Sequence, residues 1–567
     1  MFDINVFDNG DHACVAWRPA GNDPAQWQAV AGCRGFAIQR KRTRNGVLQL
    51  SWLRNRVGFA ENETAPPADQ AWRWPLQRYM WWDYDVLPSD TVQYRLFPMI
   101  GAEAALTAPD TSGDDGWTDP HTLSSDYGDG ISAWFNRGVV ATQWVERALR
   151  QQDASGTPRS TLLKAVATPG NPLRDRLGGL LKDAILKLLR EAPGPIYAAL
   201  YELNDPEVQA RLVALGQRCN LILGNGAFQP PETDENAKVR AQLKTTTINL
   251  HDRIVGSGHF AHNKFIVFCD AQGVPESVWT GSTNLTVTGL CTQVNNGVLI
   301  HDRNVAQDFR DAWDRLVAAK NGYPKTLVDP NSVQRTRQVG NTTISSWFAA
   351  TNDAQDLKQA RDLIAAAKQG ILFLFFNPGA FAQDPLKATL LQAVVARQAE
   401  PGLYVRGVVN QEIDKLTNVP VQLVTSGGAA PMNLPKRVLV PDAIDAQYGN
   451  WEKELKGASS VMVHSKVVIL DPFGDHPVVM TGSHNLGFKA SSKNDDNLVI
   501  IEGNAALAQA YAANIVAIFQ EYRWRDYVAT HGSQSGAWKG LEDDDGWQGG
   551  HLRREKDEML FWVPGGA

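Results

Sequence analysis

The spacing of apolar and polar positions changes after about residue 115. Before that point, short apolar or alternating runs stand between residues that favour turns, a pattern typical of strands in an all-β module. These runs are residues 12–17, 35–41, 46–53 and 91–101. The pattern predicts a small β-sandwich over residues 1–115.

From about residue 162, helical periodicity alternates with short apolar runs. The helical segments are residues 173–192, 205–219, 356–369 and 384–398, and the strand-like runs are residues 195–203, 220–226, 370–376 and 403–410. Strands that alternate with helices of this length indicate an α/β fold with parallel strand pairs. We expect this fold in two stretches, residues 116–330 and 331–530, followed by a C-terminal tail over residues 531–567.

Two polar side chains precede a buried strand twice in this region. In AHNKFIVF, His262 and Lys264 stand before an apolar run, and in VHSKVVILD, His464 and Lys466 do the same. Alternate residues of a strand point to the same face, so each His-x-Lys pair is expected to project together.

A second motif repeats at nearly the same distance from each histidine. TGSTNLT contains Ser282 and Asn284, and TGSHNLG contains Ser483 and Asn485. The two serines are 201 residues apart, and the two histidines are 202 apart. This constant offset indicates an internal duplication, and it predicts that the site is duplicated with the fold.

The residue types suit attack on a phosphodiester. Two lysines, with serine and asparagine donors from Ser282, Asn284, Ser483 and Asn485, can neutralise the non-bridging oxygens. One imidazole can attack phosphorus while the other protonates the leaving oxygen. Because the lysines supply the positive charge, we expect neither a metal nor another cofactor.

At these residues the chain resembles the phospholipase D superfamily, whose two HKD motifs (HxKxxxxD followed by GSxN) match both copies. The resemblance covers about residues 130–525. It implies two fused α/β halves related by a pseudo-two-fold axis, an active site at their interface, and a covalent phosphohistidine. A weaker likeness of residues 94–101 to a late strand of fibronectin type III modules concerns the β-sandwich alone.

The two motifs differ in the acidic position. Asp471 completes the second motif, whereas Cys269 occupies that position in the first and Asp270 follows one residue late. In the family this acid is thought to support the architecture more than the chemistry. The resemblance therefore still implies an active enzyme.

The residues that orient the histidines also differ. Asp496 lies 32 residues after His464, where the family often has a carboxylate that fixes the histidine, and the corresponding residue after His262 is Asn295. We expect Asp496 to orient His464 and keep it protonated as the general acid. Asn295 would then orient His262, which the resemblance implies is the nucleophile. A carboxylate beside His464 would also stabilise a cationic phosphohistidine, so the opposite assignment, with His464 as nucleophile, stays open.

Composition narrows the setting of the protein. The chain of 567 residues has 43% hydrophobic and 20% charged residues and a net charge of -6, as in an ordinary soluble globular protein. No apolar run is long enough to span a membrane, and the N-terminus lacks a signal-peptide pattern. The five scattered cysteines show no zinc spacing. These features predict a cytoplasmic protein with reduced thiols.

Three readings of the substrate remain open. A nuclease would need a basic cleft, for which residues 40–44 (RKRTR) and 53–56 (LRNR) are candidates. A phospholipase would need an apolar surface, which residues 80–86 (MWWDYDV) or 559–566 (MLFWVPGG) could supply. An inactive scaffold is disfavoured because no catalytic position is missing in either half. The GSxN turns place the nuclease slightly ahead of the phospholipase.

Overall fold

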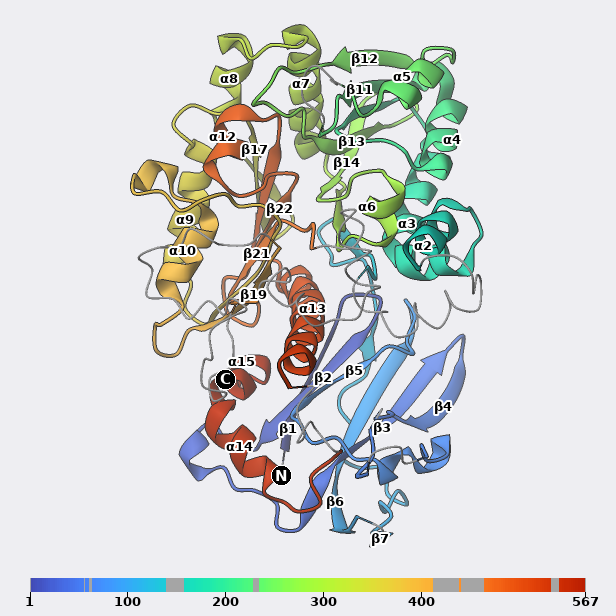
Figure 1. The fold of residues 1–567 in the computed structure, drawn as a ribbon, viewed down its shortest axis with the longest axis vertical. Helices are drawn as coiled ribbons and strands as arrows, with labels where there is room; N and C mark the ends of the chain where they lie inside the picture. The colour runs from blue at the N-terminus through green and yellow to red at the C-terminus, as the bar shows by residue number, and fades with distance from the viewer. Residues whose placement is uncertain are drawn as a thin grey trace. The chain divides into compact units, whose positions relative to one another are not determined.

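The computed structural model describes residues 2–55, 57–60, 64–103, 105–138, 158–227, 234–410, 438–439, 463–531 and 540–565 (Figure 1). The chain forms two compact units. One combines residues up to Ser125 with residues from Asp526 onward, and the other holds most of the residues between them.

The first unit is rich in β-structure, as expected. One sheet has the order β1-β2-β5, and a second has the order β4-β3-β6-β7, with β8 beside β6. The strands are β1 (Phe2–Asp8), β2 (Ala13–Pro19), β3 (Cys33–Arg44), β4 (Val47–Trp52), β5 (Met80–Asp83), β6 (Thr91–Ala102), β7 (Ala105–Leu106) and β8 (His121–Thr122). The likeness to a fibronectin type III module stays a prediction.

The C-terminal residues belong to this same unit, so the expectation of a separate tail over residues 531–567 was wrong. Helices α14 (Trp547–Arg554) and α15 (Lys556–Trp562) pack into it. The Trp547 ring stands edge-on to Phe36 at 5.7 Å, and its indole nitrogen donates to the Cys33 carbonyl at 3.0 Å. Large aromatic side chains gain most from burial, which explains why the chain returns to this core.

The two apolar stretches proposed as lipid-binding surfaces are buried in large part. In residues 80–86, Met80 and Val86 are buried while Tyr84 is 39% exposed, and in residues 559–566, Phe561 and Trp562 are buried. The sequence pattern could not distinguish this burial from exposure, because both require apolar side chains.

The second unit contains two sheets whose strand orders correspond, except that the second has one more strand, β16, at its edge. The first sheet is β12-β11-β10-β13-β14-β15-β9, and the second, read from its other end, is β20-β19-β18-β21-β22-β23-β17-β16. Each sheet has parallel pairs on one side and antiparallel pairs on the other. This correspondence confirms the expected pair of repeated α/β halves.

The strands of the first half are β9 (Ile131–Phe135), β10 (Ile196–Leu200), β11 (Cys219–Gly224), β12 (Asn249–Arg253), β13 (Lys264–Cys269), β14 (Pro275–Gly281) and β15 (Asn296–Ile300). Those of the second half are β16 (Arg335–Val339), β17 (Thr342–Phe348), β18 (Gly370–Phe375), β19 (Tyr404–Val409), β20 (Val438–Leu439), β21 (Val467–Leu470), β22 (Val478–Gly482) and β23 (Asn497–Glu502).

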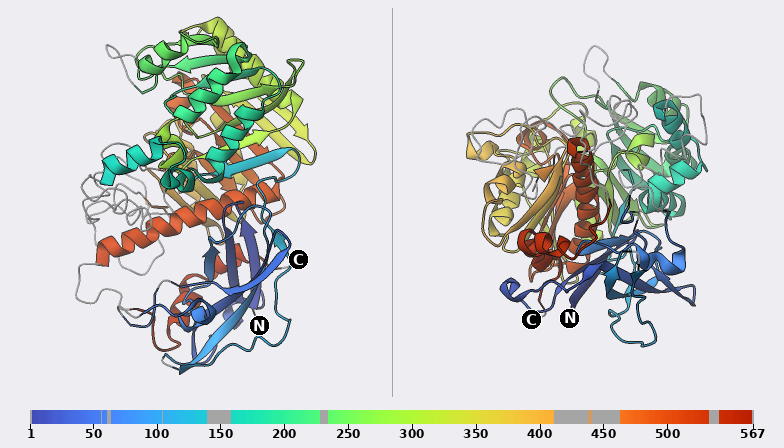
Figure 2. Two further views of the ribbon diagram at one scale, coloured as in Figure 1. Left: turned by 90° about the vertical axis from the view of Figure 1, so that its right-hand side faces the viewer. Right: turned by 60° about the horizontal axis from the view of Figure 1, so that its bottom comes forward.

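Helices cover the sheets of both halves (Figure 2). The first half has α2 (Pro158–Ala167), α3 (Pro172–Glu191), α4 (Pro206–Leu215), α5 (Ala237–Leu243), α6 (Val287–Cys291), α7 (Arg303–Ala319) and α8 (Lys325–Asn331). The second has α9 (Gln355–Ala366), α10 (Leu390–Arg397), α12 (Phe488–Lys493) and α13 (Ala505–His531), which runs on beyond this unit.

The helix starts follow from capping. Asp205 caps α4 by accepting hydrogen bonds from the Glu207 and Val208 amides, as the Asp-Pro signal indicated. The second Asp-Pro pair, expected to open a helix at residue 384, opens only a short 3-10 turn. The helix α10 starts later, where the Thr389 side chain accepts from the Gln392 amide.

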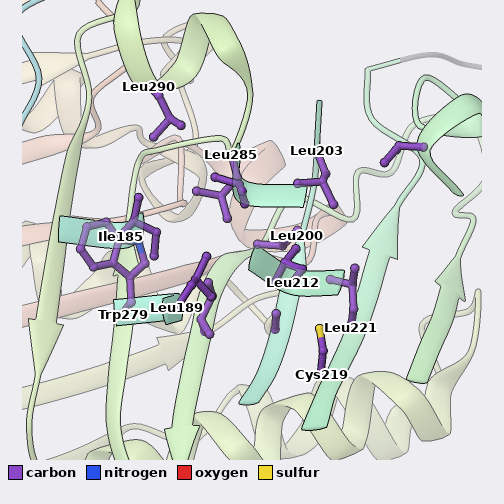
Figure 3. Close-up of a cluster of buried hydrophobic side chains, with 14 of the residues drawn as sticks. Ile185, Leu189, Leu200, Leu203, Leu212, Cys219, Leu221, Trp279, Leu285 and Leu290 are labelled. Carbon is purple, nitrogen blue, oxygen red and sulfur yellow. The ribbon is translucent and has the colours of Figure 1, made fainter. Parts of the chain in front are cut away.

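A continuous apolar core fills the first half (Figure 3). Ile185 and Leu189 of α3 pack with Leu200, Leu221 and Trp279 from three strands, and all five side chains are buried. The helix presents residues four apart on one face, which is the spacing that meets the sheet. This packed layer supports the C-terminal end of β10 and the start of β13, where His262 and Lys264 lie.

The two halves meet through backbone pairing and a buried ion pair. Phe260 bridges to Asn494, and Val294 bridges to Val463, each in parallel orientation. Arg253 of the first half binds Asp495 of the second through two contacts of 2.5 and 2.8 Å, and both side chains are 1% exposed.

The described cysteines, all five of them, are buried and form no disulfide.

Removing Arg253 should destabilise the second unit. The change Arg253→Met leaves the Asp495 carboxylate buried without its partner, and such a loss typically costs about 3–5 kcal/mol of unfolding free energy. Urea unfolding measures it. The matched control is Lys358→Met, which breaks an exposed pair with Asp362 and should cost less than about 1 kcal/mol. Equal effects of the two changes would contradict a stabilising role for the buried pair.

Candidate active site

Both His-x-Lys pairs lie at the start of corresponding strands, β13 and β21. His262 and His464 are 5% and 4% exposed, and Lys264 and Lys466 are 3% and 0% exposed. Each ammonium donates to the carbonyl of the histidine two residues before it. The same-face projection expected from strand periodicity is therefore observed, and it places four titratable side chains out of bulk water.

The two pairs face one site. Each histidine contacts a side chain of the other half, His262 with Asp496 and His464 with Asn295. Burial, and then the charges of Lys466, Lys264 and His262, lower the pKa of His464. Burial and Lys264 likewise lower the pKa of His262 to about 4. The duplication therefore brings its two copies together around a single centre.

The imidazoles are oriented across the interface between the halves. His262 Nδ1 contacts Asp496 Oδ1 at 2.7 Å, and His464 Nδ1 contacts Asn295 Oδ1 at 2.9 Å. The expectation that Asp496 orients His464 and Asn295 orients His262 was therefore wrong. Asn295 and Asp496 follow the histidine of their own half at nearly the same interval, and this repeated interval does not show which of the two histidines each residue contacts.

The motif serines hold these orienting residues. Ser282 Oγ donates to Asn295 Oδ1 at 2.8 Å, and Ser483 Oγ donates to Asp496 Oδ1 at 2.8 Å. Both serines are fully buried. In this arrangement the serines position Asn295 and Asp496, and phosphate contact by Ser282 and Ser483 stays a prediction.

The glycine before each serine is required by close backbone packing. Gly281 and Gly482 have φ values of 139° and 144°, and a Cβ atom would lie 2.4 Å from the Asn296 carbonyl oxygen and 2.3 Å from that of Asn497. Only glycine fits there. The GSxN turn thereby presses its serine against the strand that carries the orienting residue.

The motif asparagines differ in their partners. Asn284 Nδ2 donates to Glu202 Oε2 at 2.8 Å. The Oδ1 atoms of Asn284 and Asn485 are buried and have no hydrogen-bond partner within the described residues. The second amide proton of Asn284 can still reach an anion, so phosphate contact by Asn284 and Asn485 stays a prediction.

Burial makes the lysines unusual. Burial lowers the pKa of Lys264 to about 7, although Asp496 and Glu202 favour its charged form. Burial and the Lys264 charge lower the pKa of Lys466 well below its usual range. Two desolvated ammonium groups that repel one another are stabilised by an anion between them.

An aromatic ring covers each histidine. The Tyr201 ring lies 4.7 Å from His262 and 4.8 Å from the Lys264 ammonium. Phe376 repeats this arrangement, 4.6 Å from His464 and 4.5 Å from the Lys466 ammonium. Sequence reasoning missed these residues and Glu202. Their only signal is their position directly after the apolar strands β10 and β18.

The acidic positions of the motifs have structural roles. Asp471 accepts hydrogen bonds from the backbone amides of Lys368, Gln369 and Gly370, and so ties the end of β21 to the start of β18. Asp270 instead accepts from amides of its own turn. This is the architectural use that the resemblance implied for the acid, and it leaves the absence of an acid at position 269 without effect on the site.

Two absences among the described residues concern metal ions and membranes. Among the described residues, no three His, Cys, Asp or Glu side chains are grouped so as to bind a metal ion. In the same residues, no helix combines the length and hydrophobicity needed to cross a membrane.

Comparison with known proteins gives a family-level match. The family model described as "Cardiolipin synthase, PLD-like domain" matches residues 185–317 and 361–520, together more than half of the chain. No curated protein matches.

Several solved structures are similar at low identity. Phosphatidylserine synthase of Haemophilus influenzae is 13% identical, covers 68% of this chain and 93% of its own, and has a TM-score of 0.41. The phospholipase D family member NUC of Salmonella typhimurium is 20% identical over 24% of this chain and 84% of its own, with a TM-score of 0.20. NucT of Helicobacter pylori is 10% identical over 27% and 95%, with a TM-score of 0.21. These values carry no information on the substrate.

Proposed function

The chain belongs to the phospholipase D-like family, and on this premise we propose that it cleaves phosphodiesters through a covalent phosphohistidine without a metal ion. The convergence of two buried His-Lys pairs on one centre is the observation that carries the proposal. Lys264 and Lys466 would bind the non-bridging oxygens and offset the charge that builds up at phosphorus.

In the first step, His262 Nε2 would form a bond to phosphorus while the bond to the leaving oxygen breaks. Asp496 accepts the Nδ1 proton of His262, which leaves the Nε2 lone pair for attack. The same carboxylate stabilises the positive charge that the ring gains as a phosphohistidine.

His464 would serve as acid and then as base. Burial and the nearby positive charges favour the neutral ring in the empty site, so the Nε2 proton that His464 gives to the leaving oxygen would be taken up when the anionic phosphodiester binds. The ring would then take a proton from the water that displaces His262 from phosphorus. Its partner Asn295 is neutral. His464 is therefore held in place without a carboxylate that would bind the proton too firmly for transfer.

We retain nucleic acid as the first substrate class, because both halves have the GSxN turn. The basic stretch of residues 40–44 does not add support. Arg40 binds Asp83, Lys41 binds Asp114, and Arg44 binds Asp90. Arg42 likewise contacts Asp85. Cations paired in this way contribute little to the neutralisation of a phosphate backbone.

A phospholipid is the second candidate, favoured by exposed apolar residues in the first unit. Val47, Leu48 and Leu50 of strand β4 are 68%, 60% and 55% exposed. Adjacent exposed apolar side chains of this kind can insert into a lipid interface.

Two measurements test metal independence and distinguish these substrates. Hydrolysis of a p-nitrophenyl phosphodiester should persist unchanged in EDTA, because the lysines supply the positive charge. Loss of activity on chelation, restored by a divalent ion, would contradict the mechanism. DNA, RNA and phospholipid vesicles, incubated in parallel with the same protein, then show which natural phosphodiester is consumed.

Activity should fall as the pH rises through neutrality. The pKa of Lys264 is about 7 in the empty site, so a higher pH removes the proton that binds the phosphate oxygen. Since kcat/KM reports the free enzyme, we expect it to decrease above about pH 7. In Lys264→Arg this decrease should move to higher pH, because arginine stays charged. A kcat/KM that rises through this range would contradict the role of Lys264.

A further inference from the structure

A carboxyl group stands inside the proposed anion site. Glu202 is the second residue after β10, and the equivalent residue after β18 in the second half is the neutral Asn377. Glu202 Oε2 accepts a hydrogen bond from Asn284 Nδ2 at 2.8 Å. The negative charge is therefore present in one half only, next to a residue of the GSxN motif.

The charged groups around Glu202 have opposite effects on its pKa. The Glu235 carboxyl hydrogen-bonds it and favours its protonated form, whereas Lys264 and Lys466 favour the carboxylate. Tyr201, whose pKa is raised in part by Glu202, is the other titratable group that faces it. Burial and Glu235 raise the pKa of Glu202 to about 7.

The position of Glu235 is fixed by the backbone. Its Oε2 accepts from the Ala227 amide at 2.9 Å, and its own amide donates to the Asn225 carbonyl at 3.0 Å. A protonated Glu202 fits between its neighbours without rearrangement. Its carbonyl oxygen can accept from Asn284 while its hydroxyl donates to Glu235.

The empty site favours a negative charge on Glu202, whereas a bound phosphodiester disfavours it. Without substrate, the negative charges of Asp496 and Glu202 favour the charged forms of Lys264 and Lys466. A phosphodiester brings its own negative charge, and two anions close together in a poorly solvated site repel one another. Protonation of Glu202 removes this repulsion at little cost for a carboxyl that titrates near neutral pH.

We propose that Glu202 is a resident counterion of the two lysines in the empty site, beside Asp496, and that it takes up one proton from solvent when a phosphodiester binds. This inference rests on the proposed function. It makes Glu202 a positioning residue, which holds Asn284 in both states and is replaced by the substrate as the lysine counterion.

The test is infrared difference spectroscopy of the full-length protein with and without tungstate at neutral pH. Tungstate imitates a phosphate dianion and has no carboxyl band. In the wild type, binding should add the C=O band of a protonated carboxyl and remove a carboxylate band. Glu202→Gln should abolish both changes. The control Glu276→Gln removes a carboxylate of β14 outside the site and should leave them intact.

A second variant covers the case in which Glu202→Gln does not fold. Glu235→Gln removes the neighbouring charge, so the acid band of the empty protein should appear at lower pH than in the wild type. Bands that persist in Glu202→Gln, or tungstate binding without them in the wild type, would overturn this inference alone. Failure of tungstate to bind would contradict the proposed phosphate site itself.

Discussion

The change His262→Ala is expected to lower kcat on the order of 10⁵-fold, because no other described group is placed to take the role of the nucleophile. The fold should survive, since the ring has few structural contacts beyond Asp496 and Tyr201. A p-nitrophenyl phosphodiester is the appropriate substrate, because its leaving group departs without protonation and the effect then reports attack alone.

The matched variant is His464→Ala, tested with the same activated substrate. It should still form the intermediate but hydrolyse it slowly, so that one equivalent of p-nitrophenol is released in a burst. Acid quench and peptide mapping should then place the phosphoryl group on the peptide that contains HNK. A label on the peptide that contains HSK would reverse the two roles.

Much of the fold could be predicted because its signals are local. The apolar runs that became β13 and β21, and the Asp-Pro start of α4, depend on neighbouring residues. The duplication was visible because an offset of about 200 residues is a property of the sequence itself. The position of the C-terminal helices could not be predicted, because the packing of Trp547 on Phe36 joins distant parts of the chain.

The candidate site divides in the same way. His262, Lys264, His464 and Lys466 could be found because each pair lies within three residues of one strand. Their partners could not be assigned, because hydrogen bonds across the two halves leave no spacing signal. Glu202 gave no signal either, since a glutamate after a strand is usually solvated.

The crossed pairing makes Asp496→Asn the most informative single change at this site. Asp496 Oδ1 faces His262 and Ser483, while Oδ2 accepts from Asn494 Nδ2 at 3.2 Å. In the variant, the amide oxygen can keep the place of Oδ1 and accept from His262 Nδ1 and Ser483, as the Asn295 oxygen does for His464 and Ser282. The imidazole then keeps its Nε2 lone pair but loses the carboxylate that stabilises the positive charge of the phosphohistidine. We expect kcat to fall by about 10²- to 10³-fold, the usual cost of losing one electrostatic contact to a developing charge.

The intermediate distinguishes this account from the uncrossed one. If Asp496 serves His262, formation of the phosphohistidine should become the slow step in Asp496→Asn, and no burst of p-nitrophenol should appear. If Asp496 instead served His464, the intermediate would form and accumulate, as in His464→Ala. The control Asp270→Asn removes a carboxylate charge directly after β13 but keeps the side-chain oxygen that accepts from the Gln272 and Val274 amides. Its kcat should stay within about twofold of the wild type, since surface changes of this kind rarely exceed ~0.5 kcal/mol. A burst of normal size in Asp496→Asn would show that the contact between Asp496 and His262 is not needed for attack.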